Sequence, residues 1–384
     1  MTDLAPVFAI VAGEASGDLL GADLIHGLKK QYPSAIFEGI GGPKMQAQGF
    51  HSLYEMDRLS VMGLWEPLKR LPELLSMRHT IIKRYSTQKP VVFIGIDSPD
   101  FNAKIEQKLH QQGIKTVHYV SPSIWAWRTG RIKNIKRSVD LMLTLFPFEA
   151  AFYNQHQVPV CYVGHPLAKQ FPKRPQTTHA RQQLGLHKHR PTLCIMPGSR
   201  ASEVELMTEI FLDTATQVST MLGEQLQLVI PAANAARYDQ LQDIIGSRAE
   251  NLTLINQQSH LAMEAADVVL LTSGTTALEA MLLKKPMVVG YRMNSLSFRL
   301  LYPMLKTAYI SLPNLLADKK LVPELIQDHA SVKNLSTEVF SLFKAEFDSL
   351  VSEFDHLHDQ LSIDSSALAT SAIAELISGG QDGR

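Results

Sequence analysis

The sequence has little cysteine and no net charge. Among its 384 residues there are two cysteines, Cys161 and Cys194, and both lie in apolar, strand-like runs. A disulfide framework is therefore excluded, and we expect two reduced, buried thiols in a cytoplasmic protein. Lysine and arginine together number 37, as do aspartate and glutamate. This balance argues against a nucleic-acid partner, which would require at least a local basic patch.

Long apolar runs and metal-binding patterns are also missing. No uninterrupted apolar stretch approaches the length of a membrane-spanning helix, and the first residues lack the basic start of a signal peptide. A membrane role is therefore expected to be peripheral. No two aspartates are separated by a single residue, and the histidines show no ligand spacing. We expect neither a metal nor a cofactor.

Short apolar runs alternate with helical patterns, which predicts an α/β protein with doubly wound parallel sheets. The expected strands are 7–11, 91–96, 116–120, 141–145 and 158–163, and then 192–196, 227–230, 252–255, 268–271 and 287–289. A polar, proline-containing segment at 171–178 separates the two series. We expect Rossmann-like domains at 1–170 and 179–335, followed by a helical tail at 336–384 that packs back on the first domain.

Ligands of open α/β sheets bind outside the carboxyl ends of the strands. The first such turn contains Glu14 and Ser16, and its glycines would let a ligand approach the next helix. Its spacing is not that of the dinucleotide fingerprint, so NAD and FAD are not indicated. Ser16 or Asp18 could equally cap the helix, whereas Glu14 precedes the cap.

Asp97 stands at the end of the expected strand 91–96. A partly desolvated carboxylate in this position suits a general base. It could also serve only to hold the loop by hydrogen bonds, but its position favours the catalytic interpretation.

In the second half, the turn Ser273, Gly274, Thr275, Thr276 links a strand to a helix that carries Glu279 one turn inside. Free N–H groups and the helix dipole make such a turn an anion site, and a phosphate with a sugar attached would suit it. The structural alternative is that Ser273 and Thr275 only cap the helix.

Ser199 and Arg200 follow the strand at 192–196 and precede another helix. A cation at a helix start opposes the dipole, so this position favours a ligand anion, which a guanidinium can grip through its planar fork. A salt bridge from Arg200 to Glu203 or Glu205 is the alternative.

Two segments concern surfaces. Residues 61–77 are rich in leucine and methionine, and Pro67 and Pro72 are expected to break them into short pieces; they could face lipid or belong to the core. Residues 121–139 hold five basic residues and two tryptophans without an acid, which suits a membrane interface. A nucleic-acid surface and a solvated helix face are the alternatives.

Six segments together resemble the lipid-A-disaccharide synthases of Gram-negative bacteria, and the likeness spans nearly the whole chain. They are residues 13–18, 95–102, 120–128, 197–200, 273–279 and 311–316. The resemblance implies a GT-B fold, in which two Rossmann-like domains flank an inter-domain cleft. It also implies an inverting, metal-independent glycosyltransferase that joins UDP-2,3-diacylglucosamine to 2,3-diacylglucosamine 1-phosphate, giving a β(1→6) disaccharide and UDP.

Carried over position by position, the resemblance makes Asp97 the base for the acceptor 6-hydroxyl and places Glu14 and Ser16 in the cleft. The implied donor site consists of Ser199, Arg200, Ser273, Gly274, Thr275, Thr276, Glu279 and Asn314. The lipid substrates imply a peripheral position on the cytoplasmic face of the inner membrane. Two alternative functions stay open: another GT-B UDP-sugar transferase or epimerase, and a non-catalytic nucleotide-sugar sensor. The protein could also form a homodimer.

Overall fold

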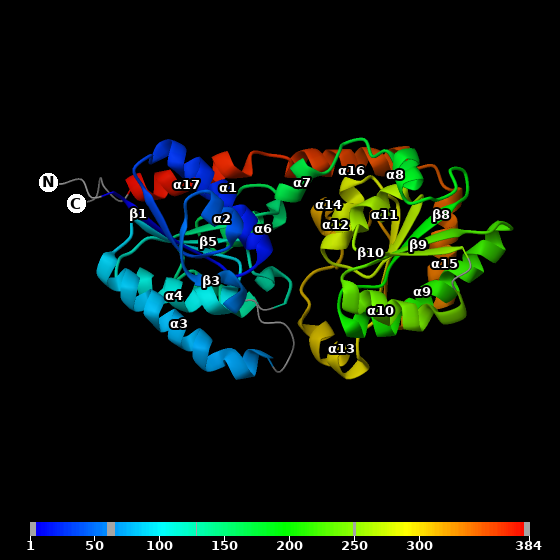
Figure 1. Cartoon of the computed structure of the whole chain (residues 1–384), viewed down its shortest axis with the longest axis horizontal. Coiled ribbons are helices and arrows are strands. Elements are labelled where there is room, and N and C mark those ends of the chain that lie inside the picture. The colour runs from blue at the N-terminus through cyan, green and yellow to red at the C-terminus, as the bar shows by residue number, and fades with distance from the viewer. Residues whose placement is uncertain (1–4, 60–65, 128, 249–250, 380–384) are drawn as a thin grey trace. The chain divides into compact units, whose positions relative to one another are not determined.

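The computed structural model describes residues 5–59, 66–127, 129–248 and 251–379. The chain divides into two units, each with its own parallel sheet (Figure 1). Unit 1 is Met1–Pro166 with Leu361–Arg384, and unit 2 is Leu167–Gln360. Residues 336–360, which the sequence assigned to the tail, therefore group with unit 2, and the chain returns to unit 1 at Leu361.

The elements of unit 1 are β1 (Val7–Ala12), α1 (Ala15–Gln31), β2 (Ile36–Gly41), α2 (Pro43–Ala47), β3 (His51–Glu55), η1 (Met56–Arg58), α3 (Glu66–Gln88), β4 (Val92–Ile96), α4 (Pro99–His110), β5 (Thr116–Tyr119), η2 (Ser123–Trp125), η3 (Thr129–Arg131), α5 (Ile132–Ile135), β6 (Leu141–Thr144), α6 (Pro147–Gln155), β7 (Val160–Tyr162) and α17 (Ser365–Ser378). The η elements are single 3₁₀ turns.

The sheet of unit 1 has the strand order β3-β2-β1-β4-β5-β6-β7, and all its pairings are parallel. Because side chains alternate along a strand, the sheet buries two apolar faces. Ile10 and Ile94 pack on the side of α1 and α17, and Val11 and Phe93 on the side of α3 and α4 (Figure 1). The last helix, α17, packs against α1, where Ser366 Oγ donates to the Asp23 carbonyl at 2.7 Å.

The elements of unit 2 are α7 (Pro166–Gln170), which starts at the boundary, α8 (Thr177–Gln183), β8 (Thr192–Met196), α9 (Ala201–Leu222), β9 (Gln227–Ala232), α10 (Ala235–Ile245), η4 (Gly246–Arg248), β10 (Leu252–Asn256), α11 (Ser259–Ala265), β11 (Val268–Leu271), α12 (Thr275–Leu282), β12 (Met287–Tyr291), α13 (Ser295–Leu301), η5 (Tyr302–Met304), α14 (Leu312–Ala317), β13 (Glu324–Ile326), η6 (Gln327–His329), α15 (Val332–Lys344) and α16 (Asp348–Leu361).

The sheet of unit 2 has the order β10-β9-β8-β11-β12-β13 and is also parallel throughout. One face packs on α9, α10 and α15, with Phe211 and Leu335 completely buried between them. The other face is covered by α11 and α12. The expected fold class, two Rossmann-like parallel-sheet domains with a helical C-terminal region, is confirmed.

Two local expectations were wrong. Pro67 and Pro72 do not break the 61–77 segment into pieces, because α3 runs without interruption from Glu66 to Gln88. Pro67 lies in the first turn, where its missing N–H would have no partner in any case, and Pro72 is accommodated inside the helix. Of the two thiols, Cys194 is buried as expected, whereas Cys161 is only half-buried.

Candidate active site

The strand order of unit 1 reverses between β1 and β4, and open α/β sheets bind ligands at such a switch point. Ala12 at the end of β1 lies beside Ile96 at the end of β4. The turns that follow these strands are therefore neighbours. One of them holds Glu14 and the other Asp97, so the structure brings together two residues that the sequence had singled out separately.

The turn at Asp97 has an unusual backbone. Asp97 and Ser98 are both left-handed, with φ of 52° and 44°, which costs about 1–3 kcal/mol for each non-glycine residue. Hydrogen bonds hold the turn: the Asp97 N–H donates to the Tyr119 carbonyl at 2.8 Å, and Asn102 Nδ2 donates to the Asp97 carbonyl at 2.9 Å. Val120, just after the adjacent β5, has φ of 78°, which is rare for a β-branched residue. Strain of this kind is typical of functional sites.

Glu14 and Ser16 are exposed at the start of α1. The expectation that Glu14 precedes the cap was wrong, because Glu14 itself occupies the N-cap position with an extended backbone. The alternative in which Ser16 caps the helix is not realised either. A Cβ on Gly13 would lie 2.3 Å from Ser98 Oγ, which shows how closely the turns after β1 and β4 approach.

Asp18 does not cap its own helix either. It is 2 % exposed, and its carboxylate accepts hydrogen bonds at 2.9–3.0 Å from three N–H groups at the start of α2, those of Gly42, Lys44 and Met45. Asp18 therefore fixes the start of α2, and its role is structural.

Unit 2 repeats the arrangement. Its strand order reverses between β8 and β11, where Met196 lies beside Leu271 and accepts a hydrogen bond from the Thr272 N–H at 3.2 Å. The turns that follow hold Ser199 and Arg200 on one side and Ser273 to Thr276 on the other. The predicted anion-binding residues thus adjoin at the switch point of the second sheet.

Arg200 makes the salt bridge that the sequence offered as an alternative. Its Nη1 lies 2.9 Å from Glu203 Oε1, and the other oxygen of Glu203 accepts from the Ser199 and Arg200 N–H groups at 3.2 and 3.3 Å. The Arg200 side chain is nevertheless 77 % exposed. Because exposed ion pairs contribute only about 0–1 kcal/mol, this contact leaves the guanidinium available to a ligand anion.

The start of α12 is open. Gly274 is the N-cap with φ of 89°, a conformation that glycine adopts without strain. Within the described residues, neither Ser273 nor Thr275 makes a side-chain hydrogen bond to the first helical N–H groups, so the capping alternative is not realised. Gly274 and Thr275 are exposed, and Thr276 is half-buried. The N–H groups and the positive end of the helix dipole thus face outward.

Glu279 lies one turn inside α12 with 17 % of its side chain exposed. Its Oε1 is 3.4 Å from Nε2 of His260 on α11, and the His260 ring packs on Phe171 with centroids 4.5 Å apart. Sequence reasoning missed His260, because nothing in its local pattern points to a partner at this distance along the chain.

Asn314 on α14 is fully buried and saturated. Its Nδ2 donates to the Val322 carbonyl and to Glu324 Oε1 at 3.0 and 2.8 Å, and its Oδ1 accepts from the Leu321 and Val322 N–H groups. Helix α14 contacts α12. The side chain therefore organises the segment beside the Gly274 turn and has no hydrogen-bonding capacity left for a ligand.

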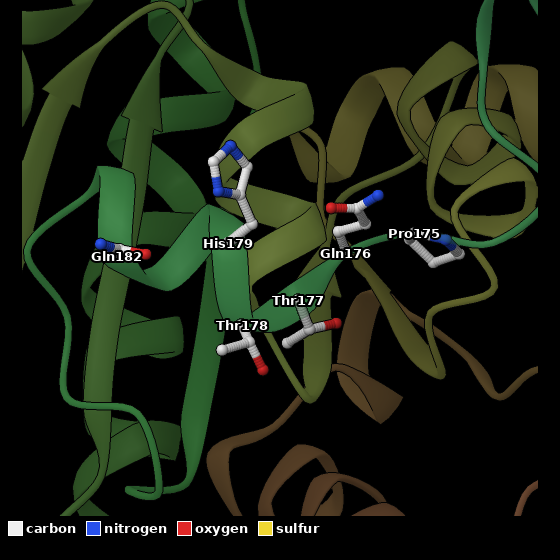
Figure 2. A pocket seen from close by; sticks show the side chains of 6 residues that line it. All are labelled: Pro175, Gln176, Thr177, Thr178, His179 and Gln182. Carbon is white, nitrogen blue, oxygen red and sulfur yellow. The ribbon is translucent and has the colours of Figure 1, made fainter.

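A surface hollow of about 520 Å³ lies elsewhere in unit 2, around the start of α8 (Figure 2). Its lining consists of Pro175, Gln176, Thr177, Thr178, His179 and Gln182. None of the strand-end residues contributes to it, and we assign it no role.

Among the described residues, no group of three or more histidine, cysteine or acidic side chains is arranged to hold a metal ion.

The two surface segments, 61–77 and 121–139, differ in which of their side chains are exposed. On α3, Leu71 and Leu75 are 47 % and 45 % exposed, whereas Met77 is 2 % exposed. Residues 60–65 lie outside the described part of the chain. In the basic segment, Arg131, Lys133, Lys136 and Arg137 are exposed. Trp125 is half-buried, and its indole N–H donates to Glu149 Oε1 at 3.1 Å, so it belongs partly to the core.

Across the described residues, we find no helix that combines the length and apolarity needed to span a bilayer.

A sequence profile of the family described as lipid-A-disaccharide synthetase matches residues 8–373. The lipid-A-disaccharide synthase of Saccharophagus degradans is 50 % identical over 97 % of both chains, and that of Cellvibrio japonicus is 53 % identical over 96 % of both.

Two solved structures with a similar fold are far more distant in sequence than these relatives. A glycosyltransferase from Rickettsia africae superposes with a TM-score of 0.60 at 9 % identity, covering all of both chains. The UDP-GlcNAc 2-epimerase of Neisseria meningitidis, bound to UDP-GlcNAc, gives 0.57 at 13 % identity over 97 % of this chain and 98 % of its own. At such identities the likeness concerns the fold alone.

Proposed function

This chain belongs to the lipid-A-disaccharide synthase family, and from that premise we propose how its two units share the reaction. The enzyme is a glycosyltransferase that joins UDP-2,3-diacylglucosamine to 2,3-diacylglucosamine 1-phosphate, releasing UDP and the β(1→6) disaccharide. The observation that carries our assignment of roles is the position of the candidate residues. Apart from Glu279 and Asn314, they lie in the turns at the switch points of both sheets, where α/β proteins bind their ligands.

Unit 2 holds the donor in this proposal. The exposed Arg200 guanidinium and the uncapped N–H groups at Thr275 and Thr276 are charge-complementary to a diphosphate. Ser199 and Ser273 flank these groups with short hydroxyl side chains. Glu279, one turn further along α12, supplies a carboxylate that can accept hydrogen bonds from the ribose hydroxyls.

Asn314 has a different part in the same unit. Because all its hydrogen bonds are made within the protein, we assign it the role of positioning α14 beside the donor turn. Glu324 supports it by accepting from the Ile310 and Ser311 N–H groups at 3.0 and 2.9 Å.

Unit 1 supplies the base. Asp97 removes the proton from the acceptor 6-hydroxyl as that oxygen attacks the anomeric carbon, and the bond from this carbon to the diphosphate breaks in line with the attack, releasing UDP. In-line displacement inverts the anomeric centre. To Glu14 and Ser16, which are exposed on the neighbouring turn, we assign the binding of acceptor hydroxyls.

The proposal also includes a contact with the membrane surface. The exposed Leu71 and Leu75 on α3 are suited to acyl chains or the bilayer interior, and the exposed cations at 131–137 to an anionic leaflet. With substrates that carry acyl chains, we propose that the enzyme works at the cytoplasmic face of the inner membrane.

The deciding experiment measures UDP release from UDP-2,3-diacylglucosamine with and without 2,3-diacylglucosamine 1-phosphate. We expect release only when both are present, together with a new disaccharide product. Consumption of the UDP-sugar without an acceptor would instead indicate an epimerase or hydrolase, and binding without turnover would indicate a nucleotide-sugar sensor.

A further inference from the structure

Unit 1 contains a buried ionisable pair that the proposed reaction does not use. Glu106 on α4 and His118 on β5 are 1 % and 3 % exposed, and Glu106 Oε1 lies 2.6 Å from His118 Nδ1. Two well-packed apolar side chains are often at least as stabilising as a buried ion pair of similar volume. Stability alone therefore gives no reason for this pair to be there.

The pair lies against the strand that leads to Asp97. In the pairing of β4 with β5, His118 is opposite Gly95, two residues before Asp97. A Cβ on Gly95 would lie 2.3 Å from Glu106 Oε1 and 2.9 Å from the Cβ of Asn102. Glycine at this position is what allows the carboxylate of Glu106 to reach His118 beside β4.

The same helix also holds the backbone of the strained turn. Asn102, one turn before Glu106, is fully buried, and its Nδ2 donates to the Asp97 carbonyl at 2.9 Å and to the Val11 carbonyl at 3.3 Å. It thus joins the ends of β1 and β4. The bond between Glu106 and His118 fixes α4 to β5, so the left-handed turn at Asp97 is held from both neighbouring elements.

The His118 imidazole also interacts electrostatically with the carboxylates of Glu106 and Asp97. Burial by itself lowers the pKa of His118, but the adjacent Glu106 carboxylate, and to a smaller extent Asp97, outweigh burial and raise that pKa overall. Among the described residues, Glu106 and Asp97 are the acidic side chains that act on the ring. The two carboxylates therefore favour the protonated form of the imidazole more than water does, in spite of its burial.

We propose that His118 and Glu106 are positioning residues for Asp97. Their contact locks α4 against β5, which keeps the left-handed Asp97 turn in place, and it lies beside the strand that ends at Asp97. The inference rests on the proposed role of Asp97 as the base, but the existence of the ion pair can be tested without it.

The test uses Glu106→Gln, which removes the charge while retaining an oxygen that can accept from His118 Nδ1. Glu38→Gln is the matched control, because Glu38 is another buried carboxylate of unit 1, 5 % exposed, and lies on β2, which β1 separates from β4. Glu38 accepts two hydrogen bonds of 2.8 Å from Arg84 on α3. We expect kcat of Glu106→Gln to fall about 10- to 100-fold, with KM for the donor and UDP affinity unchanged. The control should keep the wild-type kcat. Unchanged kcat in a folded Glu106→Gln variant would overturn the proposal.

Nuclear magnetic resonance of ¹⁵N-histidine-labelled protein, with His118 assigned by its loss in His118→Gln, provides a readout that does not depend on activity. We expect a doubly protonated His118 ring at neutral pH in the wild type and a neutral ring in Glu106→Gln. In Glu106→Gln, the decrease of kcat at high pH should accordingly begin at a lower pH than in the wild type. A neutral His118 in the wild type would overturn the proposal. If wild type forms no disaccharide, the proposed function fails while this measurement still stands. Should Glu106→Gln not fold, the double change Glu106→Gln and His118→Gln, which retains an amide hydrogen bond, replaces it in the kinetic test.

Discussion

Replacing Leu71 and Leu75 together by serine should weaken binding to lipid vesicles without unfolding the protein. Burial of a whole leucine side chain contributes about 1.5–3 kcal/mol. Because 47 % and 45 % of these two residues remain exposed, about half of that value, or ~1 kcal/mol per side chain, is available to a membrane. The pair should therefore contribute about 2 kcal/mol, which is ~30-fold in the partition coefficient.

The assay is flotation or sedimentation with vesicles containing anionic lipid, combined with a urea-unfolding curve for each variant. Met77→Ser is the control on the same helix, because Met77 is 2 % exposed. It should lower the free energy of unfolding by about 2–5 kcal/mol and leave the vesicle partitioning of the folded protein unchanged. High salt should weaken wild-type binding only in part, since screening acts on the exposed cations and not on the leucines.

Equal partitioning of the double-serine variant and the wild type would refute the lipid-facing assignment of α3. A loss of stability as large as that of Met77→Ser would refute it in another way, because the two leucines would then belong to the core. Leu64 and Leu68 belong to the same 61–77 segment. Leu64 lies outside the described residues, as does the side chain of Leu68, so the sharper test uses the two leucines whose exposure is known.

The strands that the sequence predicts are those built from continuous apolar runs, as expected for strands buried on both faces. β2 escapes this pattern because Glu38 lies in its middle, and its burial depends on Arg84, 46 residues away. β3 and β13 are edge strands of five and three residues, too short and polar to be distinguished from loops. Their existence depends on a neighbouring strand and not on their own composition.

The candidate sites also have features that local sequence predicts and features that depend on distant residues. The position of Asp97, Arg200 and the Gly274 turn just after strand ends was predictable, because each follows an apolar run and a strand end is a local property of the sequence. Which of these turns lie side by side depends on the strand order, and the sequence does not specify that order. The saturation of Asn314 was equally unpredictable, since its partners include Glu324, ten residues away in a strand that the pattern does not show.

Asp97→Asn should preserve UDP affinity and lower turnover by about two to four orders of magnitude, and near-normal turnover in the folded variant would remove Asp97 from the role of base. Arg200→Ala should weaken UDP far more than uridine, whereas Glu279→Ala should weaken both; calorimetric titrations that show equal losses on changing Arg200 would contradict the diphosphate assignment. The last prediction concerns Glu149. Burial raises the pKa of Glu149 to about 7 from the ordinary 4.5, although the Phe146 N–H and the Trp125 indole N–H both donate to it. Between these two pKa values the unfolded chain has released a proton that the folded protein retains, so this residue makes the protein less stable as pH rises through that window. The full effect is about 3 kcal/mol, reached above pH 7 and absent below pH 4.5. Glu149→Gln has no proton to release. Urea unfolding at pH 5 and pH 8 should therefore show a pH-dependent loss of stability in the wild type, relative to the variant, and identical pH dependence in the two proteins would show that Glu149 is ionised in the folded state.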